Sequence, residues 1–222
     1  KMIIDIHVHE KTFSADSGIG LEEIVEEARR KGLDGVCVTD HDSNGISEIA
    51  FEYQQKCGFT IFVGAEICDI LVFGIDELPD QKMHAGELLS LVINQGGVGI
   101  AAHPYRDNNR GLGDNIKILS DLAGIEVLNG RTEPHNNVKA LEAYQQYSMP
   151  GFGGSDAHQL DEVGKCATYF PHGIKTEADF IKAVKSKRCE PVFYENGVYR
   201  KVKRGLINEK VFSFNSGLGF CI

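Results

Sequence analysis

The sequence predicts an α/β protein with a largely parallel sheet, folded as a closed or nearly closed β/α barrel, with an open doubly wound sheet as the alternative. Three observations indicate this class. Short apolar runs alternate with longer segments of helical period along the chain. With 222 residues, 42% of them hydrophobic, the chain can bury one sizeable core, so a single domain over 1–222 is expected. No linker, low-complexity tract or internal repeat interrupts the alternation.

The expected strands are short, apolar and bounded by turn residues. They are residues 2–7, 35–39, 59–65, 70–75, 98–102, 125–128, 151–155 and 192–194. The expected helices carry apolar residues three and four positions apart, as Leu21, Ile24 and Ala28 do. They are residues 21–31, 46–57, a segment containing 87–94, 134–147 and 179–187. Residues 211–222 have no period and are expected to form a packed C-terminal tail.

Composition limits the classes of partner. With 32 acidic against 23 basic residues, the formal net charge is −9, so no positive field draws the chain onto long nucleic acid. Small anionic substrates stay open, because a bound cation reverses the local charge of a pocket. The six cysteines are scattered without a Cys-x-x-Cys pair, which favours reduced, buried thiols. The sequence begins in an apolar strand and has no run of about 18 apolar residues, so a cytoplasmic protein without membrane contact is expected.

Histidines and carboxylates recur where the expected strands end. In Asp5-Ile6-His7-Val8-His9, two histidines alternate on a strand and project from one face, close enough to bind one ion. Such a pair alone is weak, because most are ordinary polar residues. The same residue types follow later strands: Thr39-Asp40-His41-Asp42, Gly64-Ala65-Glu66, Ala101-Ala102-His103-Pro104 and Ser155-Asp156-Ala157-His158. In a β/α barrel all these ends open on one face, where active sites assemble.

The alternative interpretation is that these polar residues only cap helices or solvate loops. It explains Asp42 or Ser43 before the second helix, but not the repeated histidine after a strand. We therefore favour a metal centre, and imidazole with carboxylate suits Zn, Mn or Fe. Asp40 is expected either to accept a hydrogen bond that fixes the tautomer of His41, or to cap or face solvent. Ser155 is expected to orient its neighbours and not to act as a nucleophile.

The ordered motifs resemble the PHP family, named for polymerase and histidinol phosphatase. The resemblance runs from about residue 3 to 170. It implies a distorted seven-stranded β/α barrel of the TIM-like type, with a centre of two or three divalent metal ions that hydrolyses phosphoesters. By this resemblance, one metal is held by His7, His9, Glu66 and Asp156. Glu66 bridges to a second metal. Another metal is held by Asp16, His41 and His158, and His103 joins Glu66 at the remaining site. For Asp16, a helix-capping or turn role is the alternative.

This chain departs from the family pattern at two places. Many relatives carry another His or Cys after the strand that here ends at Asn129, where the chain offers only Asn129 or Arg131, so the third metal is expected to be weak, replaced or absent. Only Ile67, Cys68 and Asp69 separate Glu66 from the next strand-like run, a shorter connection than in relatives.

The implied chemistry needs no protein nucleophile, because two metals can activate a bridging water and share the charge that develops on phosphoryl oxygens. Arg106, Arg110 and Arg131 follow strand ends, and one or more of them is expected to clamp the substrate phosphate, with solvated surface arginines as the alternative. The expected substrate is a small phosphomonoester, a nucleotide or a short oligonucleotide end. The alternatives are an amidohydrolase-type C–N hydrolase, which predicts a bridging lysine or an equivalent ligand, and an inactive metal-binding regulatory domain. The oligomeric state stays open.

Overall fold

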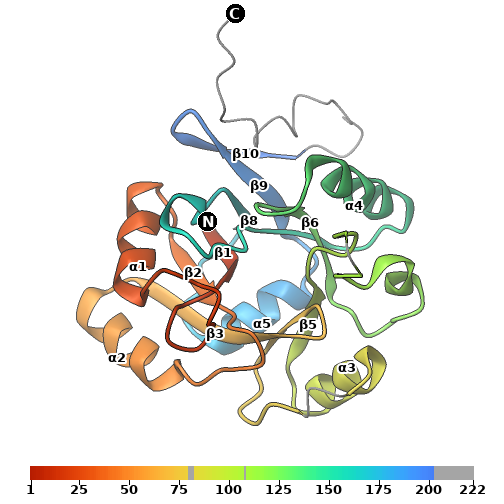
Figure 1. Ribbon diagram of the computed structural model, residues 1–222, viewed down its shortest axis with the longest axis horizontal. Helices are drawn as coiled ribbons and strands as arrows, with labels where there is room; N and C mark the ends of the chain where they lie inside the picture. Colours follow the sequence, from red (N-terminus) through yellow and green to blue (C-terminus); the bar gives the residue numbers. More distant parts are fainter. Residues whose placement is uncertain (80–82, 108, 203–222) are drawn as a thin grey trace, which may run out of the picture.

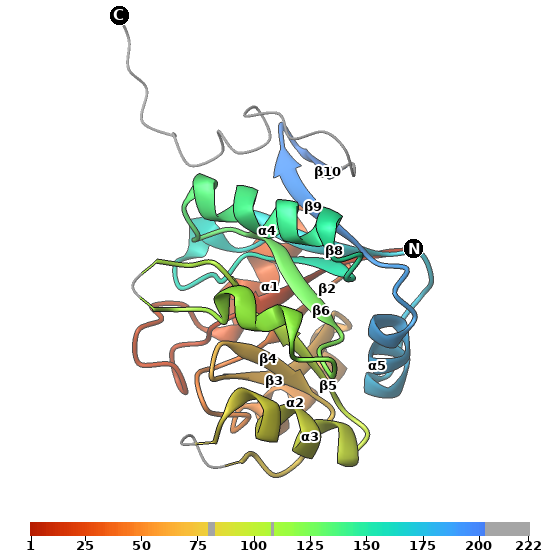
Figure 2. The same ribbon diagram turned by 90° about the vertical axis from the view of Figure 1, so that its right-hand side faces the viewer.

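The computed structural model describes residues 1–79, 83–107 and 109–202. Figures 1 and 2 show a curled sheet with helices around its outside. The tail predicted over 211–222 lies outside the described residues. In the described part of the chain, no helix is long and apolar enough to cross a membrane.

Ten strands of the described residues form one sheet, in the order β10-β9-β8-β1-β2-β3-β4-β5-β6-β7. Their bounds are β1 (Met2–Val8), β2 (Gly35–Val38), β3 (Thr60–Ile67), β4 (Ile70–Phe73), β5 (Val98–Ala101), β6 (Gly124–Asn129), β7 (Gly151–Gly154), β8 (Cys166–Phe170), β9 (Glu190–Glu195) and β10 (Val198–Lys201). Neighbours pair in parallel from β1 to β3 and from β5 to β7. The other pairings are antiparallel.

The five α-helices of the described residues lie close to where the apolar spacing predicts them. They are α1 (Leu21–Arg30), α2 (Ser47–Cys57), α3 (Ala85–Asn94), α4 (Pro134–Gln146) and α5 (Glu177–Lys185), with short 3-10 turns η1 (Gly113–Lys117) and η2 (Leu160–Glu162). Local signals fix their ends. Pro134 opens α4, Gly58 closes α2 in the left-handed region, and the Thr176 hydroxyl caps α5 by accepting from the Asp179 amide at 3.1 Å.

Helix α5 closes the end of the sheet where the parallel strands β1 to β3 begin. Figure 2 places α5 on the same side as the N-terminus. Its Phe180 is fully buried, with its ring 5.0 Å from the rings of Phe62 and Phe73 and 5.7 Å from that of Phe170. This aromatic cluster fills one end of the interior, and the parallel strands β1 to β3 and β5 to β7 therefore present their carboxyl ends at the opposite end.

The chain after β7 returns to the end of β1. The Asp156 amide donates to the His7 carbonyl at 2.7 Å, the His9 amide donates to the Ala157 carbonyl at 3.0 Å, and Val8 forms a parallel bridge with Ala157. The predicted α/β class with a curled, barrel-like sheet is thereby confirmed. A seven-stranded TIM-like barrel is not confirmed, because the sheet has ten strands and mixes parallel with antiparallel pairs.

The short connection after Glu66 is a tight hairpin. Ile67 of β3 pairs with Ile70 of β4, and Cys68 and Asp69 between them have φ of 51° and 58°. Two positive φ values in a two-residue loop are typical of the turn that suits the twist of a β-hairpin. Because a parallel neighbour needs a crossover of a dozen residues or so, this connection makes β4 antiparallel to β3.

Candidate metal centre

The end of β1 supplies the first two ligand candidates. His7 and His9 are both fully buried, and their Nε2 atoms lie 3.0 Å apart. Their side chains therefore share one face of the strand, as the alternation predicts. Asp5, on the same face, accepts backbone hydrogen bonds from His7, Ser155 and Gly164 at 3.3, 2.9 and 2.8 Å. Burial raises the pKa of Asp5 to about 6, although these hydrogen bonds counteract the rise.

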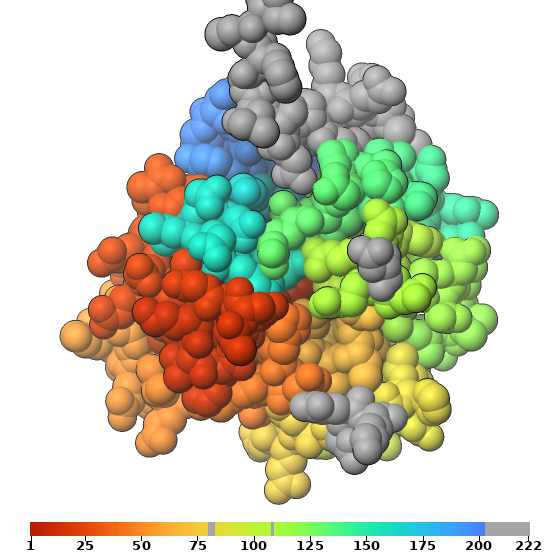
Figure 3. Space-filling view, viewed as in Figure 1, coloured from red at the N-terminus to blue at the C-terminus, as the bar shows by residue number. Residues whose placement is uncertain are grey.

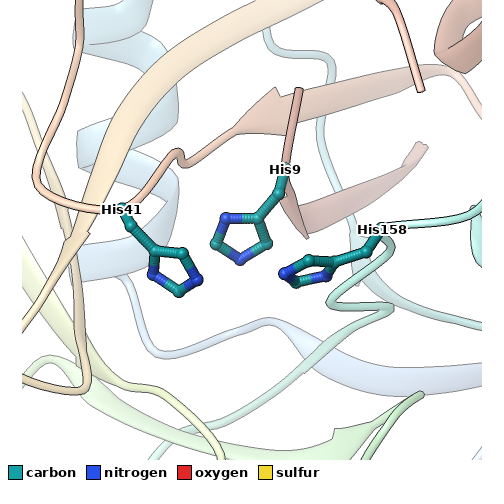
Figure 4. A group of neighbouring side chains, drawn as sticks. All are labelled: His9, His41 and His158. Carbon is teal, nitrogen blue, oxygen red and sulfur yellow. The ribbon is translucent and has the colours of Figure 1, made fainter. Parts of the chain in front are cut away.

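Side chains from other strand ends surround this pair. His41 follows β2, Glu66 lies near the end of β3, and His103 follows β5; Asp156 and His158 follow β7. Figure 4 shows the rings of His9, His41 and His158 pointing toward one another. The ring centroids of His41 and His158 lie 4.2 and 4.3 Å from that of His9. The structure thus brings together the histidines of the strand-end pattern with Glu66 and Asp156.

Segments far apart in the sequence meet over these strand ends. In the space-filling view of Figure 3, the red segment near the N-terminus, the teal segment after β7 and the yellow-green segment after β5 adjoin near the middle of one face.

Glu66 occupies the middle of the cluster. Its Oε2 lies 3.4 Å from Nε2 of both His7 and His9 and 3.1 Å from His41 Nδ1, while Oε1 lies 2.8 Å from His103 Nε2. The Oε2 atom is buried and has no well-formed hydrogen bond. Burial alone would raise the pKa of Glu66, but the neighbouring imidazoles of His7, His103 and His41 hold it well below its usual range.

Asp156 faces the same two histidines from the other side. Its Oδ1 lies 3.5 Å from His7 Nε2 and 3.3 Å from His9 Nε2, and Arg106 Nη2 donates to its Oδ2. Burial would raise the pKa of Asp156, but His7, His9 and the Arg106 guanidinium hold it well below its usual range. The carboxylate is therefore ionised and has one oxygen turned to the histidines.

Asp16 reaches the rim of the cluster from the loop between β1 and α1. Its Oδ2 lies 3.1 Å from His158 Nε2 and 3.4 Å from His41 Nε2, and its side chain is 57% exposed. Gly20, not Asp16, is the residue that precedes the first turn of α1. Asp16 therefore does not cap α1; it lies in a turn beside His41 and His158, and its role as a metal ligand stays a prediction.

Among the described residues, the donor atoms fall into three groups that fit divalent metal ions. Within each group the ligand atoms lie within 4.8 Å of one another; the groups are His9, His41 and His158; His7, Glu66 and His103; and His7, His9 and Asp156. Imidazole nitrogen and carboxylate oxygen are the donors that Zn, Mn and Fe prefer. A buried carboxylate oxygen that faces three imidazoles without a well-formed hydrogen bond fits a metal bridge.

Asn129 is fully used by protein groups. Its Oδ1 accepts from Arg106 Nη2 at 2.8 Å, Thr132 Oγ1 at 3.1 Å and the Arg131 amide at 3.0 Å. Its Nδ2 donates to Glu126 Oε2 at 3.0 Å. The group of His7, Glu66 and His103 therefore gains no ligand from Asn129, in agreement with the departure noted in the sequence.

Glu126 supports the cluster and was not predicted. Its Oε1 lies 3.1 Å from His7 Nδ1, and its Oε2 accepts from the His103 amide at 2.8 Å. It is fully buried within β6. A charged residue inside the apolar run 125–128 was the signal that could have revealed it, because buried carboxylates need partners.

Asp40 has a different partner from the one predicted. Its Oδ1 accepts from the Glu10 amide at 2.6 Å and from Ser14 Oγ at 3.0 Å, whereas His41 turns its Nδ1 to Glu66. The prediction that Asp40 fixes the tautomer of His41 needs this correction, since consecutive side chains of an extended segment point to opposite sides. Burial raises the pKa of Asp40 to about 6.

The three predicted arginines line one cleft of about 470 Å³, together with Asp107, Glu133, Thr132 and Asn136. Arg106 also donates to Thr132 Oγ1 and to Asp156, so it joins the cleft to the cluster. Arg110 Nε lies 3.7 Å from Asp69, and Arg131 Nε lies 3.5 Å from Glu162. Both arginines are partly exposed, so neither ion pair is tight.

Fold and site together define an α/β protein that gathers histidines and carboxylates at the carboxyl ends of its strands. Residues 134–189 match a family model described as PHP-associated. An uncharacterized protein of Methanocaldococcus jannaschii is 31% identical over 170 residues, which cover 68% of this chain and 96% of that protein. The chain belongs to the PHP family.

Solved structures share the fold at low identity. PsfC from Pseudomonas syringae has a TM-score of 0.68 at 20% identity, covering 88% of this chain and 93% of its own. A "putative metal-dependent phosphoesterase" from Bifidobacterium adolescentis has a TM-score of 0.59 at 20% identity. The match covers 83% of this chain and 96% of that chain. An amidohydrolase from Chromobacterium violaceum with bound sulfate and no metal has a TM-score of 0.59 at 16% identity. The match covers 87% of this chain and 98% of that chain.

Proposed function

We propose that this protein is a metal-dependent hydrolase that cleaves small phosphoesters. The observation that carries the proposal is the position of Glu66, whose buried Oε2 lies within 3.4 Å of imidazole nitrogens of His7, His9 and His41. A carboxylate among three imidazoles is suited to join two cations. Membership of the PHP family and the fold shared with the Bifidobacterium protein support the same proposal.

The residues proposed to hold the ions are those of the three groups, with Asp16 completing the group of His41 and His158. Bound divalent ions would supply an activated water and neutralise the charge that develops on the phosphoryl oxygens. The chain positions the donors: Glu126 orients His7, and Arg106 holds Asp156. Two ions are proposed as the functional set, because Asn129 leaves the third group with three protein ligands.

The arginine cleft is proposed to bind the substrate phosphate. Three arginines and two acidic residues, Asp107 and Glu133, line the cleft, and Arg106 joins it to the cluster by donating to Asp156. Planar guanidinium groups bind phosphate oxygens bidentately. We propose a small phosphomonoester, a nucleotide or a short oligonucleotide end as the substrate. A cytoplasmic location and a single domain over 1–222 also stay proposals.

Removing a partly exposed arginine tests the clamp. Arg131→Ala is expected to raise KM for a phosphomonoester roughly 10- to 100-fold, because one hydrogen bond to a charged group contributes about 1.5–3 kcal/mol. Metal content should stay unchanged, because the side chain of Arg131 forms its ion pair with Glu162, which is not a ligand candidate. Exposed Arg188→Ala is the matched control. If Arg131→Ala and Arg106→Ala both left KM and kcat unchanged, the clamp would be wrong.

The C–N hydrolase alternative has one supporting observation, the fold shared with the Chromobacterium amidohydrolase. Glu66 stands against it, because a carboxylate already occupies the bridging position where that chemistry predicts a lysine or an equivalent ligand. A role for His158 in the cluster also favours the phosphoesterase.

Metal analysis joined to a substrate panel separates the candidates. Protein reconstituted with Mn²⁺ or Zn²⁺ is expected to retain metal and to hydrolyse aryl phosphates or nucleotides, and the Glu66→Ala protein should do neither. Hydrolysis of amides or cyclic imides alone would favour the C–N hydrolase. Retained metal without any hydrolysis would favour the regulatory domain.

A further inference from the structure

Ser14 lies at the meeting point of two ligand candidates and a buried carboxylate. Its Oγ lies 3.2 Å from His9 Nδ1, accepts from the His41 amide at 3.1 Å and donates to Asp40 Oδ1 at 3.0 Å. Ser14 is almost fully buried, and its own amide donates to the Glu10 carbonyl at 2.9 Å. The loop after β1 therefore holds this hydroxyl in one place.

The three contacts use the full capacity of a hydroxyl group. A serine oxygen has one proton and two acceptor positions. Asp40 takes the proton, because a carboxylate oxygen that already faces the Glu10 amide can only accept. The His41 amide fills one acceptor position, so the remaining one faces His9 Nδ1, which must donate.

We infer that Ser14 is a positioning residue that fixes the Nδ1–H tautomer of His9. His9 then presents the lone pair of Nε2 to Glu66 and Asp156, 3.4 and 3.3 Å away. Because His9 belongs to two of the three groups, one hydroxyl orients a donor that both share. The same oxygen fixes the backbone of His41, so Ser14 also sets the spacing between His9 and His41. Partners of this kind orient metal-binding histidines and typically change metal affinity by about 10- to 100-fold.

The inference rests on the proposed metal centre, and zinc binding to the full chain tests it. Ser14→Ala is expected to weaken zinc binding roughly 10- to 100-fold in competition with a chelator. The matched control is Ser17→Ala, because Ser17 Oγ donates to the His9 carbonyl at 2.7 Å and leaves the imidazole untouched. In ¹⁵N-labelled, zinc-loaded protein, the slowly exchanging Nδ1–H signal of His9 should be present in wild type and Ser17→Ala and absent in Ser14→Ala.

A second pair of variants serves if Ser14→Ala does not fold. Asp40→Asn keeps an oxygen that accepts from Ser14, so zinc affinity should stay within about threefold of wild type. Asp40→Ala frees the Ser14 proton to point at His9 Nδ1, so affinity should fall as in Ser14→Ala. The inference would be overturned if Ser14→Ala bound zinc as tightly as wild type and kept the Nδ1–H signal of His9. Wild-type zinc affinity in Asp40→Ala would overturn it too. Neither result would contradict the metal centre itself. A wild-type protein that binds no zinc would overturn both.

Discussion

Replacing Glu126 by glutamine should change the metal centre without substituting any proposed ligand. Glu126 Oε2 accepts two hydrogen bonds, from the His103 amide at 2.8 Å and Asn129 Nδ2 at 3.0 Å. Two donors at one oxygen require the amide oxygen of the glutamine to stay there. The new NH₂ group must then lie where Oε1 was, 3.1 Å from His7 Nδ1.

A donor at that position forces His7 into the opposite tautomer. Nδ1 must then accept, the ring proton moves to Nε2, and Nε2 is the atom that faces His9 and Glu66. A protonated nitrogen cannot bind a metal ion. We expect metal affinity to fall about 10- to 100-fold, or about 1.4–2.7 kcal/mol.

Competition between the protein and a chromophoric chelator for zinc measures this loss. Glu142→Gln on the exposed face of α4 is the matched control and should bind as wild type does. Zinc affinity that is the same in Glu126→Gln, Glu142→Gln and wild type would show that Glu126 does not set the tautomer of His7.

Two further predictions concern stability. Phe180→Ala should lower the free energy of unfolding in urea by about 3–5 kcal/mol, because the fully buried ring leaves a cavity among Phe62 and Phe73. Phe51→Ala, with a side chain that is 63% exposed, should change it by no more than about 0.5 kcal/mol; equal losses would contradict the packing described for α5. Burial raises the pKa of Asp5 from 3.8 to about 6, so the folded chain binds this proton more tightly than the unfolded chain does. The free energy of unfolding of metal-free protein should therefore fall as the pH rises from about 4 to 6. Asp5→Asn should remove that part of the pH dependence, and an unchanged slope would show that Asp5 does not titrate there.

The sequence predicted the elements wherever one periodic pattern decided them. The β1 strand with its two histidines and the helix α1 with its apolar spacing lie where expected. The strand β8 (Cys166–Phe170) was missed because no α-helix separates it from β7, and β10 (Val198–Lys201) was missed because its side chains are largely exposed. The antiparallel direction of β4 was missed because Cys68 and Asp69 lack the glycine that usually marks such a turn.

The site was predictable to the extent that its donors follow strands. Each residue of the three groups follows a strand or lies near its end, so position brought them together, whereas Asp16 lies further along the loop after β1. Ser14 and Glu126 act through hydrogen bonds between segments far apart in the chain, and Glu126 and His7 are separated by 119 positions. Such pairs depend on the register of the sheet, which local pattern does not specify.

Anomalous diffraction from crystals grown with Mn²⁺ tests the metal centre most directly. Our account predicts at least two anomalous peaks joined by Glu66, one bound by His7, His9 and Asp156, and another beside His41 and His158. A map with full occupancy of manganese elsewhere, or with no peak next to Glu66 in protein that hydrolyses phosphoesters, would contradict it.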